Sequence, residues 1–177
     1  MKIVIVLGSG NSGAGAIYDY LRSRTDFQAP FYGKEFRIVN DPNGLDQLYH
    51  SLYKNFSING SANSIEEFKK FIVNSYHSNY NKNLYLNKNL IKLSNLFIKR
   101  ISKTTYNGCP RFYFDKLTLI KKINFYLKRF IFMKNAKEIP MLQMTIPCEE
   151  KRFLEYAEEY FFSIFRSYKD FNEKKNI

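Results

Sequence analysis

The feature that most constrains the fold is an apolar run followed directly by a glycine-rich segment. Ile3 to Leu7 is an unbroken apolar and mostly β-branched run, typical of a strand that is buried on both faces of a parallel sheet. Gly8 to Gly15 then holds four glycines and no side chain larger than asparagine. A helical pattern follows, because the apolar residues between Ala16 and Leu21 fall on one face. The sequence therefore predicts a buried strand, a tight loop and a helix.

A strand, a small-residue loop and a helix form an arrangement that can hold a phosphate group. Backbone N–H groups of the loop point toward the anion, and the helix N-terminus adds its partial positive charge. Glycine is needed because such loops adopt positive φ and because a Cβ would block the anion. The alternative to phosphate binding is that the segment is only a tight connection between a strand and a helix, as found in any α/β domain. We expect a phosphate or nucleotide to be bound by Gly8, Ser9, Gly10, Asn11, Ser12, Gly13, Ala14 and Gly15.

Three known phosphate-loop patterns can be compared with this segment. A Walker A loop requires a lysine and a hydroxyl residue directly after its second conserved glycine. Gly8 and Gly13 have the required spacing, but Ala14 and Gly15 follow. An ordinary ATPase or GTPase is therefore not expected.

The dinucleotide-binding fingerprint G-x-G-x-x-G is met by Gly8, Gly10 and Gly13. That fingerprint also needs an acidic residue about 20 residues further on, at the end of the second strand. Asp26 precedes any second strand, and Asp41 lies further along the chain than the fingerprint requires. A dinucleotide-binding (Rossmann) oxidoreductase domain stays open as an alternative.

The third pattern is the phosphosulfate loop of sulfotransferases, commonly G-x-x-[RK]-[ST]-G-[TS]-[TS]. Gly8, Ser12 and Gly13 match it, whereas Asn11 replaces the basic residue and the last two hydroxyl residues are missing. The segments Phe27 to Leu48 and Tyr106 to Leu117 add to the match. With them the chain resembles bacterial sulfotransferase-like proteins, of the kind linked to surface polysaccharides.

This resemblance implies binding of 3′-phosphoadenosine 5′-phosphosulfate and transfer of its sulfuryl group to a carbohydrate hydroxyl, without a metal. The backbone N–H groups of Ser9 to Ala14 would hold the phosphosulfate. Lys34 or Arg37 would supply the positive charge that Asn11 lacks, and Glu35 would act as the general base. A surface carboxylate paired with Lys34 or Arg37 is the alternative for Glu35.

Two further expectations concern single features. His50 lies beside apolar positions of a helical pattern and is expected to be a partly buried structural histidine. The R-x-P…S element that binds the 3′-phosphate in this group is not found in the sequence. The resemblance then implies either an N-terminal portion of such a protein or a reduced, inactive relative. A non-catalytic basic interaction module is the alternative from another class.

The charge balance favours an anionic partner. The chain has 28 Lys and Arg against 16 Asp and Glu, a formal net charge of +12. The basic residues occur in short groups along helical patterns, which favours solvated faces over a nucleic-acid surface. Cys109 and Cys148 share no ligand spacing with His50 or His77, so no metal site is expected. Two free thiols and no leader or membrane-spanning segment fit the cytoplasm.

The rest of the chain reads mainly as helices. Helical patterns cover residues 45–56, 64–76, 90–101, 116–134 and 148–170. Residues 35–40 are expected to be a second strand, with a short helical turn as the alternative, and residues 104–110 to be irregular or a short strand. An extended segment is expected at 139–147, a polar loop at 59–63 and a turn at Asp41–Gly44. Ser64 and Glu67 have capping-box spacing, so we expect a helix to begin there.

Together these patterns predict one α/β domain over residues 1–177, rich in helix, with a few-stranded parallel sheet flanked by helices. Within it, residues 1–44 form the phosphate-loop unit and second strand, 45–138 a helical region, and 139–177 an extended segment and last helix. So few strands leave apolar surface uncovered. We expect an exposed apolar patch near the C-terminus, covered by a missing half or by a second copy of the chain.

Overall fold

The computed structural model describes residues 4–6, 8, 12–28, 36–77, 84–108, 111–131 and 142–167, with residues 172, 175 and 177. Helices predominate, as the sequence predicts. In chain order the elements are α1 (Ala14–Ser23), α2 (Leu45–Tyr49), the π-helix η1 (His50–Lys54), α3 (Ile58–His77), α4 (Leu84–Ile101), β1 (Ser102–Gly108), α5 (Arg111–Lys116), α6 (Leu119–Ile131), β2 (Leu142–Pro147) and α7 (Glu150–Arg166).

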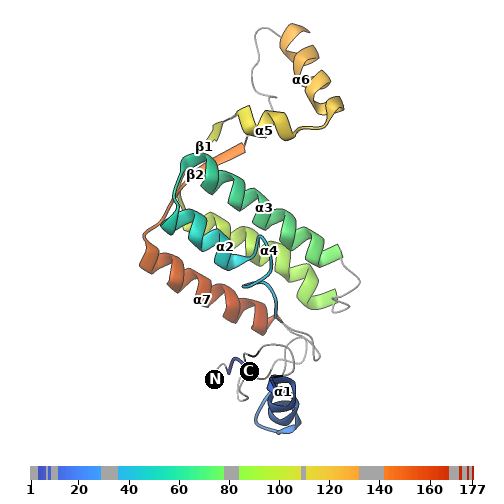
Figure 1. The fold of residues 1–177 in the computed structure, drawn as a ribbon, viewed down its shortest axis with the longest axis vertical. Helices are drawn as coiled ribbons and strands as arrows, with labels where there is room; N and C mark the ends of the chain where they lie inside the picture. Colours follow the sequence, from blue (N-terminus) through green and yellow to red (C-terminus); the bar gives the residue numbers. More distant parts are fainter. Residues whose placement is uncertain are drawn as a thin grey trace.

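The central part is a layer of helices: α2 with η1, α3, α4 and α7 (Figure 1). α3 packs against α2, α4 and β2, and α4 packs against α7. The two strands lie at one end of these helices, and α5 and α6 extend beyond the strands. α1 lies at the opposite end, near both chain termini.

One large cluster of buried side chains joins the central helices. Phe97 of α4 stacks on Tyr160 of α7, with ring centroids 4.9 Å apart, and meets Phe153 edge-on at 5.6 Å. Burying an aromatic or aliphatic side chain of this size stabilises a fold by about 1.5–3 kcal/mol. The cluster consists of Ile38, Leu45, Leu48, Leu52, Ile65, Phe68, Ile72, Leu90, Phe97, Ile98, Ile101, Cys148, Phe153, Ala157, Tyr160 and Ile164.

The sheet is antiparallel, so the expected parallel sheet is wrong for the residues that the structure describes. Tyr106 of β1 lies opposite Met144 of β2, and Gly108 lies opposite Leu142. Leu142 and Met144 are buried with Ala62 of α3. An antiparallel pair can cover one face in this way and leave the other in water, whereas parallel strands need cover on both faces. The extended segments expected at 104–110 and 139–147 are confirmed as β1 and β2.

The predicted buried strand Ile3 to Leu7 is wrong where the structure describes it. Residues 4–6 belong to no strand, and the exposed fractions of Val4 and Ile5 are 44% and 73%. The Val4 N–H donates to the Ile177 carbonyl at 2.6 Å. A central parallel strand needs hydrogen-bonded neighbours on both edges. Among the described residues, however, the two strands of the sheet pair only with each other.

The expected turn at Asp41–Gly44 is confirmed, and it leads directly into α2. The Gly44 N–H donates to the Asp41 carbonyl at 2.7 Å, and Asn43 adopts a φ of 65°. The Leu45 N–H donates back to the Ile38 carbonyl at 2.8 Å. Residues 38–40 form a turn that brings these carbonyls to the helix start. The Asp41 N–H donates to the Arg37 carbonyl at 3.0 Å, so the strand expected at 35–40 is wrong over the described residues 36–40, whereas the alternative of a short helical turn agrees with the structure.

The helix that was expected to begin at Ser64 begins six residues earlier, at Ile58, so that it includes the whole of the expected polar loop at 59–63. Ser57 is its cap, because Ser57 Oγ accepts a hydrogen bond from the Gly60 N–H at 3.0 Å. The small side chain of Ser61 is fully buried and donates to the Ile58 and Thr145 carbonyls at 3.0 and 3.3 Å. Small residues at 59–63 therefore allow α3 to approach β2, and they do not form a loop.

The remaining helices follow the sequence patterns with adjusted ends. α4 and α7 confirm the helices expected at 90–101 and 148–170. The long helix expected from Lys116 is divided, because α5 ends at Lys116 and α6 begins at Leu119. Leu117 and Thr118 separate them, and the Thr118 carbonyl accepts the Lys122 N–H at 3.0 Å at the start of α6. The expected part beyond Ile131 lies outside the described residues.

Candidate functional site

The glycine-rich loop is described in part, at Gly8 and from Ser12 onward; Ser9, Gly10 and Asn11 lie outside the described residues. Gly8 lies against the start of α1. A Cβ on Gly8 would come within 2.2 Å of Ser12 Oγ and 2.5 Å of the Ala14 Cβ. A side chain at position 8 would therefore require the start of α1 to shift.

The N-terminus of α1 has no side-chain cap among the described residues. Gly13 precedes the helix with a φ of 80°, a left-handed conformation that favours glycine. Among the described residues no side chain caps this end, and the first turn holds no acidic residue. A Cβ on Gly13 or Gly15 would meet no described atom within 4 Å. The first N–H groups of the helix thus have no side-chain cap among the described residues, and uncapped N–H groups at a helix N-terminus can bind an anion.

The structure places one of the three expected catalytic residues, since Lys34 and Glu35 lie outside the described residues. Arg37 precedes α2, and its Nε lies 2.8 Å from Asp41 Oδ1. This ion pair spans the turn just before Asp41–Gly44, in which the Asp41 N–H donates to the Arg37 carbonyl at 3.0 Å, so Arg37 contributes to the local structure there. The structure thus brings Gly8 together with Ser12 and Ala14 and holds Arg37 in another turn.

His50 is not the partly buried histidine that the sequence pattern predicts. Its side chain is 54% exposed, and Nε2 lies 3.7 Å from Asp46 Oδ1 one helical turn earlier. The expectation is wrong because η1 turns this position away from the core. Leu52 of the same π-helix is buried instead.

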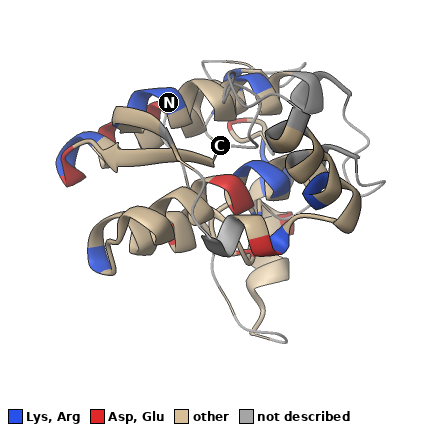
Figure 2. Ribbon diagram, turned by 90° about the horizontal axis from the view of Figure 1, so that it is seen from above, with Lys and Arg blue, Asp and Glu red and all other residues tan. Residues whose placement is uncertain are grey.

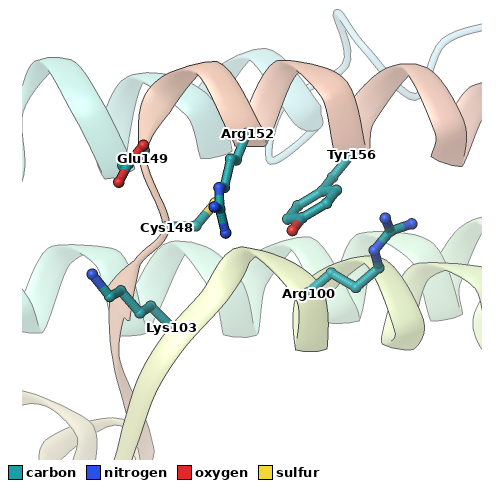
Figure 3. Close-up of a pocket in the computed structure, with 6 residues that line it drawn as sticks. All are labelled: Arg100, Lys103, Cys148, Glu149, Arg152 and Tyr156. Carbon is teal, nitrogen blue, oxygen red and sulfur yellow. The ribbon is translucent and has the colours of Figure 1, made fainter.

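A basic pocket that the sequence analysis did not predict lies where α4, β1 and α7 meet (Figure 3). Its volume is about 240 Å³. Arg152 and Tyr156 project into it from α7, opposite Arg100 at the end of α4. The lining residues are Arg100, Lys103, Cys148, Glu149, Arg152 and Tyr156.

The charges of the pocket suit a small anion. Arg100 lies over the Tyr156 ring, 4.1 Å from its centroid, and donates a hydrogen bond to Glu159. This bond lowers the pKa of the Glu159 carboxyl and raises that of Arg100. Lys103 and Arg152 form no ion pair with any residue that the structure describes. Since ligand pockets commonly exceed about 300 Å³, this one fits an oxyanion and is too small for a nucleotide.

The Cys148 thiol belongs to the core side of this pocket. Cys148 is buried, its N–H donates to the Ile101 carbonyl at 2.7 Å, and its Sγ lies 3.6 Å from the Tyr53 hydroxyl. Tyr53 also donates to the Cys148 carbonyl at 3.0 Å. Burial raises the pKa of Tyr53, and the hydrogen bond to Cys148 adds to this rise. Both groups hold the start of α7 against η1.

Sequence alone could not have found this pocket. Arg100 and Lys103 lie about fifty residues before Arg152 along the chain. The packing of α4 on α7 and the pairing of β1 with β2 bring the two segments together. Elsewhere Lys and Arg are spread over several helices, as the sequence predicts (Figure 2).

The described residues contain no group of three or more His, Cys, Asp or Glu that could hold a metal ion. Within the same residues, no helix has the length and apolar character needed to cross a membrane. No protein-family model, curated protein or solved structure matches the chain.

Proposed function

We propose that this chain is a sulfotransferase-like protein. In this proposal the loop Gly8–Gly15 binds 3′-phosphoadenosine 5′-phosphosulfate, and the sulfuryl group passes to a carbohydrate hydroxyl. The observation that carries the proposal is the open N-terminus of α1 behind Gly13. Uncapped N–H groups without a nearby carboxylate favour an anion. The sequence resemblance supplies the choice of phosphosulfate over other phosphates.

The proposed chemistry assigns a role to each expected residue. The acceptor oxygen forms a bond to sulfur as the bond from sulfur to the 5′-phosphate oxygen breaks, and adenosine 3′,5′-bisphosphate leaves. Glu35 takes the hydroxyl proton. A cation must stabilise the departing phosphate oxygen. Arg37 is held by Asp41, so Lys34 is the better candidate for this second role.

The proposal rests on the loop and the helix, because residues 4–6 form no strand. A phosphosulfate-binding fold with a parallel sheet would need Ile3–Leu7 to pair with strands outside those described. The rival dinucleotide-binding proposal needs the same strand, so this observation does not separate the two. Ligand binding does separate them.

The test is calorimetric titration of the chain with adenosine 3′,5′-bisphosphate, and in parallel with NADH. We expect the bisphosphate to bind and NADH not to bind. Gly15→Val should weaken binding, because it fills open space at the first turn of α1. The matched control is Ala16→Val, the next position of the same helix, which should bind as the parent does. Tight NADH binding without bisphosphate binding would favour the oxidoreductase.

The basic pocket supports a second candidate function: anion binding without catalysis. Lys103 and Arg152 stand beside the first turn of α7, at the far end of that helix from α1 (Figure 1). Arg152→Ala would abolish sulfate binding at this pocket and leave bisphosphate binding at the loop unchanged. If Arg152→Ala instead removed bisphosphate binding, the loop would not be the nucleotide site.

A further inference from the structure

Helix α6 carries an exposed apolar face. At about 100° per residue, six apolar side chains of α6 fall within less than half of the helix circumference. All six are at least 48% exposed, and Phe130 and Ile120 reach 88% and 77%. They are Leu119, Ile120, Ile123, Tyr126, Leu127 and Phe130. An apolar face of this size is uncommon on a soluble monomer and marks an interaction surface.

The other side of α6 is basic. Lys121, Lys122, Lys128 and Arg129 occupy helical positions outside the apolar face, and the helix contains no Asp or Glu. Apart from Phe125, the apolar positions and the charged positions lie on different sides of the helix, and the charges have one sign. This combination is typical of helices that lie in the plane of an anionic membrane surface.

Helix α6 contacts α5: Lys122 Nζ donates to the Asp115 carbonyl at 2.8 Å, and the Tyr126 ring lies 5.7 Å from the Phe114 ring. Most of the apolar face stays exposed in the part of the chain that the structure describes. Both contacts lie at one edge of the apolar face. Figure 1 shows α6 beyond the strands, away from the central helices. This face lies at the opposite end of the structure from the chain termini (Figure 1), so it is not the apolar patch expected near the C-terminus, which stays a prediction.

We propose that α6 binds the surface of an anionic lipid bilayer, with its apolar face in the acyl region and its basic side toward the head groups. Charge complementarity selects this occupant. Two copies of α6 packed face to face would bring together two helices with four positive charges each, whereas anionic lipid attracts them. The helix has 13 residues, about 20 Å, so it lies along the surface and is too short to cross it.

The absence of tryptophan from the sequence makes a single-site reporter available. In the full chain, Phe130→Trp places the only indole on the apolar face of α6. Titration with phosphatidylcholine vesicles containing one-quarter phosphatidylglycerol should shift its emission to the blue. Pure phosphatidylcholine vesicles should cause a much smaller shift, and high salt should reduce the shift with anionic vesicles. The control reporter Leu154→Trp lies on the exposed side of α7 and should not shift.

Two further variants test the two halves of the proposal in the Phe130→Trp background. Ile123→Asp removes apolar area and should weaken vesicle binding at least tenfold. Lys121→Glu with Lys128→Glu reverses two charges and should weaken binding to anionic vesicles by a similar factor. Circular dichroism should show unchanged helix content in both.

Three results would overturn the proposal. One is no shift with anionic vesicles, and another is an equal shift for both reporters. The third is a blue shift without lipid that grows with protein concentration, together with a dimer in light scattering. That last result would assign the face to a second copy of the chain. The failure of the donor-binding proposal would affect none of these measurements.

Discussion

Ser94 Oγ and the Tyr160 hydroxyl oxygen lie 2.6 Å apart in the buried interface between α4 and α7. Ser94 donates its own hydrogen to the Leu90 carbonyl at 2.7 Å, so Tyr160 is the donor to Ser94. Both residues are almost fully buried. A buried hydroxyl that loses its partner lowers the free energy of unfolding by its full desolvation cost, whereas a hydrogen-bonded pair adds only modestly to that free energy.

This relationship predicts unequal effects for the two single substitutions. Ser94→Ala leaves the Tyr160 hydroxyl buried without its acceptor and should reduce the free energy of unfolding by about 1–3 kcal/mol. Tyr160→Phe leaves Ser94 bonded to Leu90 and should cost about 0.5–1.5 kcal/mol. The double variant should cost less than the sum of the two. Urea unfolding measures all four proteins, and strict additivity would contradict the proposed pairing.

Gly44 is the position where a close approach requires glycine. A Cβ there would lie 2.5 to 2.8 Å from the carbonyl oxygens of Ile38, Val39 and Asp41, and backbone oxygens cannot move aside cheaply. Gly44→Ala should therefore destabilise the protein by about 1–3 kcal/mol, the usual cost of overpacking. Gly15→Ala is the matched control, because its Cβ meets no described atom within 4 Å. It should be neutral or stabilising by up to about 1 kcal/mol. Thermal unfolding of both variants tests this prediction. Equal losses of stability for Gly44→Ala and Gly15→Ala would contradict it.

Local secondary structure was predictable from sequence where a few adjacent residues determine it. The Asp41–Gly44 turn and helices α4 and α7 depend on side chains within their own segments. That residues 4–6 form no strand was not predictable, because an apolar run such as Val4–Val6 becomes a strand only if other strands pair with it. The basic pocket was missed for a similar reason, since it depends on the packing of α4 against α7 and on the pairing of β1 with β2.

At the start of α3 the sequence contains a capping-box spacing that does not mark the beginning of the helix. Ser64 and Glu67 have the spacing of a capping box, but Ser61 and Ala62 before them are buried in the helix against β2. Sequence patterns do not reveal that a strand from residues 142–147 packs on these small side chains. Ser57, seven residues earlier, is the residue that caps the helix.

The two serines give a direct test of this assignment. Ser57→Ala removes the acceptor of the Gly60 N–H and should lower the free energy of unfolding by about 0.5–2 kcal/mol, typical of a lost N-cap. Ser64→Ala lies within the helix and should be neutral or slightly stabilising, since alanine is the better helix former. Urea denaturation of the two variants is the measurement. A larger loss for Ser64→Ala would restore the helix start expected from the sequence.

The carboxylate of Glu150 joins the first turn of α7 to α2 and η1, and it makes stability depend on acid pH. It accepts hydrogen bonds from the Tyr49 hydroxyl and from Lys54 Nζ, the latter at 2.9 Å. The Tyr49 hydrogen bond, followed by that from Lys54, lowers the Glu150 pKa. In the unfolded chain this pKa is about 4.3. The contribution of Glu150 to folding is therefore present above that value and is lost as pH falls through the lower folded pKa.

Glu150→Gln should therefore flatten the acid side of the stability profile. Below about pH 5, the free energy of unfolding of the parent should fall more steeply with decreasing pH than that of the variant. Glu149→Gln is the matched control, because among the described residues the Glu149 side chain accepts no capping hydrogen bond from the N–H groups at the start of α7. It should keep the pH slope of the parent. Urea unfolding at a series of pH values between 3 and 7 gives the slopes, expressed as protons taken up on unfolding. Parallel profiles for Glu150→Gln and the parent would show that the pair with Tyr49 and Lys54 does not stabilise the junction of η1 with α7.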